Sequence, residues 1–106
     1  MTYRSVYDSL RNRYLSLALA PDTLFLLRPS DAFHFIEEAC ALGLDLAGIE
    51  GFQVTESGAY QPCQSFSNDV ADFVGSREEF FKESKRLIKQ IKNERIRIQI
   101  VIEGLD

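Results

Sequence analysis

The sequence predicts one α+β domain, in which a three- or four-stranded, partly antiparallel sheet packs against about three helices. Three observations carry this prediction: helical spacing of apolar residues near the N-terminus, a complete helix-capping pattern before a second amphipathic segment, and strict apolar–polar alternation at the end of the chain. The chain has 106 residues, of which 45% are apolar and 11% aromatic. These values are typical of a single globular domain, here spanning residues 1–106.

The first helix is predicted before Pro21, from an apolar stripe that begins at Tyr3. Its apolar stripe follows the spacing i, i+4, i+7, i+11 and i+14 and consists of Tyr3, Tyr7, Leu10, Tyr14 and Leu17. Pro21 is expected to stop this helix, because proline cannot continue the hydrogen bonding of a helix. The apolar run at residues 23–28 then predicts a short buried strand.

A second helix is predicted to begin at Pro29, since proline suits the first helical turn and the side chains of Ser30 or Asp31 can accept hydrogen bonds from its free N–H groups. The residues expected to point inward are Ala32, Phe35, Ile36, Ala39 and Cys40. Gly43 is well placed for the left-handed conformation that often follows a helix.

The middle of the chain predicts one strand and a less regular stretch. Residues 44–54 read as a strand in which Gly48 and Gly51 indicate a bulge or a close approach of another backbone. Residues 59–68 are polar and without clear period, so we expect an irregular segment containing Cys63. Residues 69–74 are predicted to form a short strand.

The last two elements have the clearest signals. Ser76 and Glu79 form a capping box, which predicts a helix from there to about Lys92. The inner face of this helix is expected to consist of Phe80, Phe81, Ser84, Leu87, Ile88 and Ile91. Residues 95–103 alternate strictly, with isoleucine at every second position from Ile96 to Ile102, which predicts a strand with one buried and one solvated face.

The charges are unevenly distributed along the chain. The net charge is −4, yet residues 29–76 contain eight acidic residues and no Lys or Arg, while residues 82–97 contain seven of the twelve basic residues. We therefore expect one negative and one positive region of the molecule, and we expect the negative region to bind a basic partner.

The sequence contains no recognisable catalytic, cofactor or metal motif. His34, the only histidine, lies one helical turn from Glu37 and Glu38 and is interpreted as a surface residue. Neither cysteine has the spacing of a zinc site, and the glycines around Glu50 do not match a phosphate-binding loop. We therefore predict a protein that is not an enzyme and has no cofactor or metal.

Two other classes of partner are also disfavoured. No apolar run approaches the roughly 20 residues that span a bilayer, and residues 1–21 lack the apolar core of a secretory signal, so a cytoplasmic protein without a membrane partner is expected. The basic residues of 82–97 are mixed with glutamates on a helix, as on an ordinary solvated face. With a pI near 5.0, direct nucleic-acid binding is not expected.

Acidic and aromatic side chains of the negative region are the candidates for partner binding, because carboxylates steer association with basic proteins and aromatics anchor interfaces. The predicted residues are Glu37, Glu50, Glu56, Tyr60, Asp69 and Asp72. Two interpretations of Glu50 stay open. Its carboxylate either accepts hydrogen bonds from nearby backbone N–H groups at the glycine-bounded irregularity, which is slightly favoured, or is aimed outward as part of an acidic surface.

The chain also resembles a family of small bacterial immunity proteins, of the colicin type or of contact-dependent growth inhibition. The resemblance covers about half of the chain and depends on RPSDAFHFIEEACALGLDLAGIEGF at residues 28–52, then YQP, then VADF at residues 70–73. The pattern in relatives resembles xDAxxFIExxxxxGIxVLGIEGF, a later proline and IADFS. Val74 departs from it, where relatives have serine.

The resemblance implies a cytoplasmic inhibitor that binds and neutralises the C-terminal domain of one cognate toxin, often a nuclease, and has no catalytic residues of its own. Combined with the charge distribution, it predicts an antitoxin that occludes the toxin's active cleft with an acidic surface. The alternative is an acidic adaptor module whose partner is not a toxin.

Overall fold

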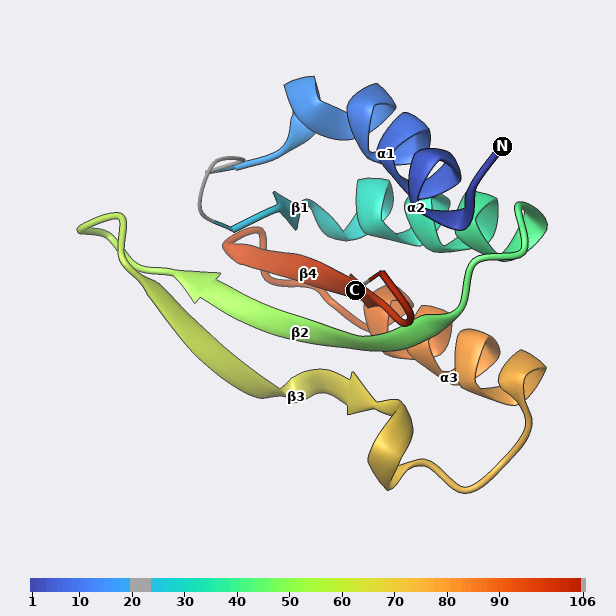
Figure 1. Cartoon of the computed structure of the whole chain (residues 1–106). Helices are drawn as coiled ribbons and strands as arrows, with labels where there is room; N and C mark the ends of the chain where they lie inside the picture. Colours follow the sequence, from blue (N-terminus) through green and yellow to red (C-terminus); the bar gives the residue numbers. More distant parts are fainter. Residues whose placement is uncertain (20–23, 106) are drawn as a thin grey trace.

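The computed structural model describes residues 1–19 and 24–105 and confirms the α+β prediction. The helices and strands are α1 (Tyr3–Tyr14), η1 (Leu15–Leu17), β1 (Leu26–Leu27), α2 (Pro29–Ala41), β2 (Leu46–Val54), β3 (Tyr60–Asp69), η2 (Val70–Asp72), α3 (Arg77–Lys89) and β4 (Ile96–Ile102). The four strands are ordered β1-β4-β2-β3, and each neighbouring pair is antiparallel (Figure 1).

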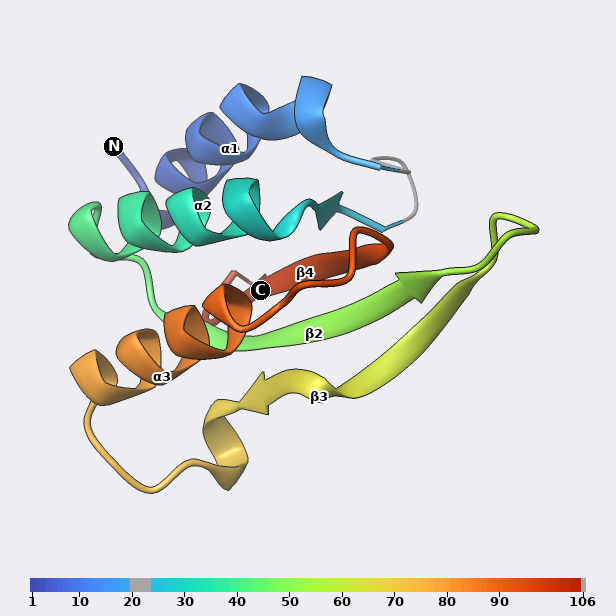
Figure 2. The same ribbon diagram turned by 180° about the vertical axis from the view of Figure 1, so that it is seen from behind.

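Helices α2 and α3 lie side by side on one face of the sheet, and α1 packs against α2 (Figures 1 and 2). The core lies between these helices and the sheet. Its members from β4 are the predicted isoleucines, which are at most 7% exposed, whereas Val101 on the opposite face is 44% exposed. The strict alternation of the last strand is therefore confirmed, because one face meets helices and the other does not.

The Cα radius of gyration is 13.2 Å, close to the roughly 13 Å expected for one domain of this length. Over residues 1–19 and 24–105, none of the helices has both the length and the apolar character needed to cross a bilayer.

The first helix is shorter than predicted. α1 ends at Tyr14 and continues as the 3₁₀ turn η1, in which Leu17 is 50% exposed, so its assignment to the buried stripe was wrong. A 3₁₀ turn has three residues per turn, which rotates Leu17 away from the stripe laid down at 3.6 residues per turn. Pro21 lies outside the described residues. Of the strand predicted at 23–28, β1 comprises Leu26–Leu27, and Thr23 also lies outside.

α2 begins at Pro29 as predicted, but in the described part of the chain no side chain caps it, so the roles predicted for Ser30 and Asp31 were wrong. Its inward-facing residues are buried except Cys40, which is partly buried at the edge of the core. Gly43 has φ +80° as predicted. The N–H of Gly43 donates to Cys40 O (3.1 Å) and that of Leu44 to Ala39 O (2.9 Å), which satisfies the carbonyls at the end of the helix.

Two predictions for the middle of the chain were wrong. The segment expected to be irregular is the long edge strand β3, in which Cys63 packs partly buried against the core. The segment expected to be a strand is the 3₁₀ turn η2, because the Asp69 carboxylate accepts a hydrogen bond from the N–H of Ala71 (2.9 Å) and turns the chain. The capping box of Ser76 and Glu79 is confirmed, although α3 ends at Lys89 rather than near Lys92.

Candidate protein-binding surface

The pairing of β2 with β3 is interrupted by a large bulge in β3 opposite Glu50. Ile49 pairs with Asn68, but Gly51 already pairs with Cys63, so residues 64–67 of β3 form an excursion opposite a single residue of β2. The Ser67 hydroxyl stabilises this excursion, since it accepts a hydrogen bond from the N–H of Gly51 (3.2 Å) and donates one to Cys63 O (3.0 Å). The bulge predicted from the glycines is thus confirmed.

Both glycines are required by close contacts with β3. A Cβ at Gly48 would lie 2.6 Å from Asn68 O, and one at Gly51 would lie 2.9 Å from the Cβ of Phe66. Real side chains do not approach so closely, so each glycine allows the backbones of β2 and β3 to come together around the bulge.

The bulge forms one wall of a hollow of about 400 Å³, which we call the acidic hollow. Three of the six residues predicted to bind a partner line it, namely Glu50 from β2, Asp69 from the end of β3 and Asp72 from η2. Gln64, Ser67, Asn68 and Val101 are among its other lining residues. Within the described part of the chain, no Lys or Arg lines the acidic hollow.

Glu50 lies on the sheet face that α2 and α3 do not cover. Its neighbour Ile49 pairs with Ile100, and both isoleucines belong to the core on the helix-covered face. Because successive residues of a strand point to opposite faces, Glu50 and its partner Gln99 lie on the uncovered face. Among residues 1–19 and 24–105 its carboxylate has no hydrogen-bond or ion-pair partner. The slightly favoured interpretation, a carboxylate bonded to backbone N–H groups, was therefore wrong, and the outward interpretation agrees with the structure.

Asn68 connects the wall of the acidic hollow to the helical layer. Its side-chain amide donates to the hydroxyl of Ser84 (3.3 Å), a fully buried residue of α3. Asn68, Ser67 and Gln64 were missed as site residues. Their only sequence signal is a polar, non-alternating stretch, which does not show which residue faces Glu50.

The other three predicted partner-binding residues lie elsewhere. Glu56 and Tyr60 lie at the tip of the β2–β3 hairpin, which extends beyond the helices and is the end of the strand pair remote from Asp69 (Figure 1). Glu37 lies on α2, where its carboxylate is 3.6 Å from His34 Nδ1 and 3.9 Å from Lys85 Nζ of α3. The six residues therefore do not form one surface.

Other acids of the negative region are paired within the protein. Glu38 binds Arg13 (3.4 Å) and accepts a hydrogen bond from the hydroxyl of Tyr14 (2.9 Å). Burial of Tyr14 and this hydrogen bond to a negatively charged group raise the pKa of its phenol to about 12.

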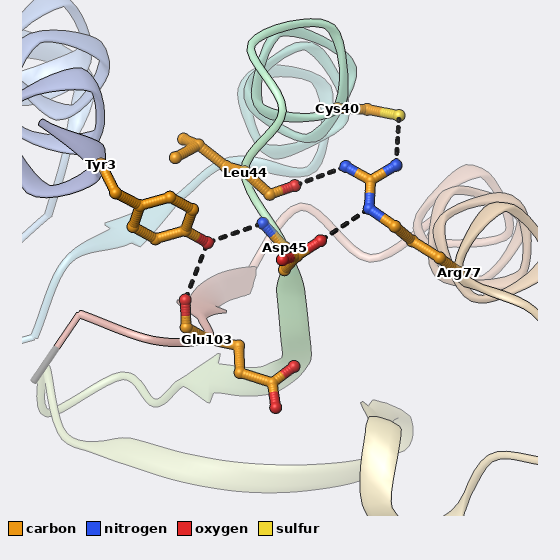
Figure 3. Close-up of polar contacts among 6 residues, drawn as sticks. All are labelled: Tyr3, Cys40, Leu44, Asp45, Arg77 and Glu103. Atoms are coloured by element: carbon orange, nitrogen blue, oxygen red, sulfur yellow. Dashed lines mark hydrogen bonds and ion pairs between the residues drawn. The ribbon is translucent and has the colours of Figure 1, made fainter. Parts of the chain in front are cut away.

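Asp45 is paired with Arg77, as Figure 3 shows. Arg77 Nε donates to Asp45 Oδ1 (2.7 Å), and its Nη2 donates to Leu44 O (2.7 Å). The hydrogen bond to Asp45 raises the pKa of the Arg77 guanidinium above its ordinary value. The backbone N–H of Asp45 donates a hydrogen bond to the hydroxyl of Tyr3 (2.8 Å). That hydroxyl in turn donates a hydrogen bond to Glu103 O (2.8 Å; Figure 3).

Glu37, Glu38 and Asp45 are thus paired, whereas three of the other five acids of the negative region line the acidic hollow. Among the described residues, no three or more His, Cys, Asp or Glu side chains are arranged to hold a metal ion.

A scan of the chain against protein-family models found no match, and searches of curated proteins and of solved structures found none either. The resemblance to immunity proteins therefore stays a prediction.

Proposed function

We propose that this chain is an immunity-type inhibitor that binds the C-terminal domain of a cognate bacterial toxin, a nuclease, through the acidic hollow. The observation that carries the proposal is the convergence of Glu50, Asp69 and Asp72 in one hollow that no described Lys or Arg lines. The motifs at residues 28–52 and 70–73, on which the resemblance to immunity proteins depends, supply all three of these residues or their immediate neighbours.

The mechanism is electrostatic and steric. A nuclease holds its anionic substrate with Lys and Arg side chains, and these are the groups that the carboxylates of the acidic hollow complement. Glu50 and Asp72 are free to pair with such cations, while Asp69 keeps its hydrogen bond to Ala71. The sheet face around Glu50 then covers the nuclease cleft, so the substrate is excluded without any catalytic step by the inhibitor.

The biological test is co-expression with the C-terminal domain of the protein encoded beside this chain. We expect that domain to arrest growth alone and this chain to restore growth. An unrelated neighbouring gene, together with no toxin in a pull-down, would contradict the proposal. Copurification with a non-toxic protein would favour the adaptor function instead.

The surface is tested with the double variant Glu50→Gln/Asp72→Asn, measured by calorimetry against the toxin domain. Losing one desolvated charge pair weakens binding at least about tenfold. Glu56→Gln/Glu78→Gln is the matched control, because both carboxylates are exposed and the variant removes the same two charges outside the acidic hollow. Equal affinity of the double variant and the control would place the toxin on another face of the protein.

A further inference from the structure

A second hollow formed by the described residues is positively charged and lies between the start of α2 and the end of α3. Its volume is about 870 Å³, and we call it the basic hollow. Four cationic side chains line it: Arg28, Lys89, Lys92 and Arg97. One carboxylate, Glu94, also lines it, so the formal excess is four minus one, or three positive charges. None of these residues lines the acidic hollow.

The cations of the basic hollow come from separate parts of the chain. Lys89 and Lys92 lie at and just beyond the end of α3, where positive side chains complement the negative end of the helix dipole. That role does not account for Arg28, which precedes α2, or for Arg97, which belongs to β4. Like charges brought together from three segments repel one another, and a bound anion relieves the repulsion.

The cationic groups are available to a ligand and partly oriented. Arg28 and Lys92 are exposed, and within residues 1–19 and 24–105 neither forms an ion pair. Arg97 Nη1 donates to the carbonyls of Glu94 (2.7 Å) and Ile96 (3.0 Å), which fixes the position of its guanidinium. Lys89 Nζ lies 5.1 Å from the centre of the Phe33 ring.

The remaining lining of the basic hollow is mixed. Ser30 supplies a hydroxyl, and its N–H belongs to the first turn of α2, which no described side chain caps. Phe33, Ile88 and Ile91 supply apolar surface. Arginine forks and lysine ammonium groups bind phosphate oxygens, and apolar surface accommodates the rest of an organic ligand.

We propose that the basic hollow binds a phosphorylated small molecule of nucleotide size, with the phosphates held by Arg28, Lys92 and Arg97. The volume is within the roughly 300–1,000 Å³ of small-molecule sites. This binding is independent of the proposed function, because it uses different residues on a different part of the molecule.

The test is titration of the whole chain with adenosine triphosphate, inorganic pyrophosphate and adenosine, followed by calorimetry and by backbone amide NMR. We expect both phosphate compounds to bind and to shift the amides of Ser30 and Asp31, and adenosine alone to have no effect. The double variant Arg28→Gln/Lys92→Gln should weaken binding at least about tenfold, since each lost contact is a hydrogen bond to a charged group.

Lys82→Gln is the control for loss of a positive charge outside the basic hollow, because Lys82 is an exposed lysine of α3 that does not line it. It should bind both phosphate compounds as the unaltered chain does. No binding at millimolar concentration, or an equal loss in Lys82→Gln and the double variant, would overturn the proposal. So would tighter binding of a single-stranded oligonucleotide than of adenosine triphosphate, which would indicate a nucleic-acid surface. Circular dichroism verifies that each variant is folded.

Discussion

At the scale of single residues, Arg77 joins parts of the chain that are far apart in sequence. Its guanidinium contacts Asp45 and Leu44, which lie just before β2, and Nη1 lies 3.9 Å from Cys40 Sγ near the end of α2 (Figure 3). The guanidinium carbon also lies 4.8 Å from the centre of the Phe81 ring. Arg77 thus attaches α3 to the junction between α2 and the sheet, a role that requires the planar fork of arginine.

We therefore predict that Arg77→Lys destabilises the protein although it keeps the charge. A lysine cannot reach both Asp45 and the Leu44 carbonyl, and the loss is expected to be about 1–3 kcal/mol in the free energy of unfolding. Urea denaturation measures it. Arg86→Lys is the control, since Arg86 pairs with Glu83 on the exposed side of its own helix, and it should lower the free energy of unfolding much less than Arg77→Lys does. Equal losses for the two variants would contradict the role given to Arg77.

Tyr14 predicts a change of stability at high pH. Its pKa of about 12 in the folded protein exceeds the value of about 10 for an unfolded tyrosine, so folding favours the protonated phenol. This contribution is complete below about pH 10 and is lost as the pH rises to about 12. Comparing the unfolding free energies of the unaltered chain and Tyr14→Phe across this range should show their difference shrinking.

The tyrosinate absorbance of Glu38→Gln provides the check on this interpretation. Removing the negative charge from the hydrogen-bond partner should lower the pKa of Tyr14, while burial keeps it above the ordinary value. An unchanged pKa in Glu38→Gln would mean that burial alone produces the shift.

At the scale of elements, the pairing of β2 with β3 determines the shape of the acidic hollow. Gly48 pairs with Asp69, and Gly51 pairs with Cys63, on the two sides of the excursion. The close approach at Gly48 brings the end of β3 and the following turn η2 next to Glu50. A larger residue at either glycine moves β3, and with it Asp69 and Asp72.

Gly48→Ala is accordingly expected to cost about 2–3 kcal/mol, because the added methyl meets a backbone carbonyl that can move only with its strand. Hydrogen exchange at the amides of Asn68 and Asp69 should accelerate. Gly58→Ala is the comparison. A Cβ added at Gly58 would meet nothing within 4 Å, but the backbone φ of +84° strains an alanine at this position. It should lose about 1–2 kcal/mol and leave exchange at Asn68 and Asp69 unchanged. Equal exchange in both variants would contradict the packing argument.

At the scale of the whole molecule, charge is separated into two hollows of opposite sign. Glu50, Asp69 and Asp72 line the acidic hollow on one side, and Arg28, Lys89, Lys92 and Arg97 line the basic hollow between helices. A net charge of −4 conceals this separation. A partner approaching from solvent experiences the local field of one hollow, since salt screens charges farther away than about 8–10 Å.

If the partner is a basic toxin domain, as we propose, its association rate with this chain should therefore fall as the salt concentration rises. Stopped-flow measurements of Glu50→Gln/Asp72→Asn should give a shallower dependence than the unaltered chain, because fewer charges steer the encounter. Arg28→Gln/Lys92→Gln should keep the full dependence or bind slightly faster. A salt dependence that is the same in the acidic and the basic double variants would contradict steering by the acidic hollow.

Much of the fold was predictable from local patterns. The capping box of Ser76 and Glu79, the left-handed Gly43 and the alternation of β4 each depend on residues within a few positions of one another, and the structure confirms all three. β3 could not be recognised, because its excursion breaks the period of two and much of it is exposed on both sides.

The sequence by itself determined the fold class, the glycine-bounded irregularity around Glu50 and the uneven distribution of charge. Only the tertiary structure decided which carboxylates are neutralised and which converge. Asp45 binds Arg77 and Glu38 binds Arg13 across 32 and 25 positions. Glu50 lines the same hollow as Asp69 and Asp72 because β2 and β3 pair around a large bulge. The physical reason is that charges interact through space, and the distance between them depends on register and helix packing, which single-residue patterns do not specify.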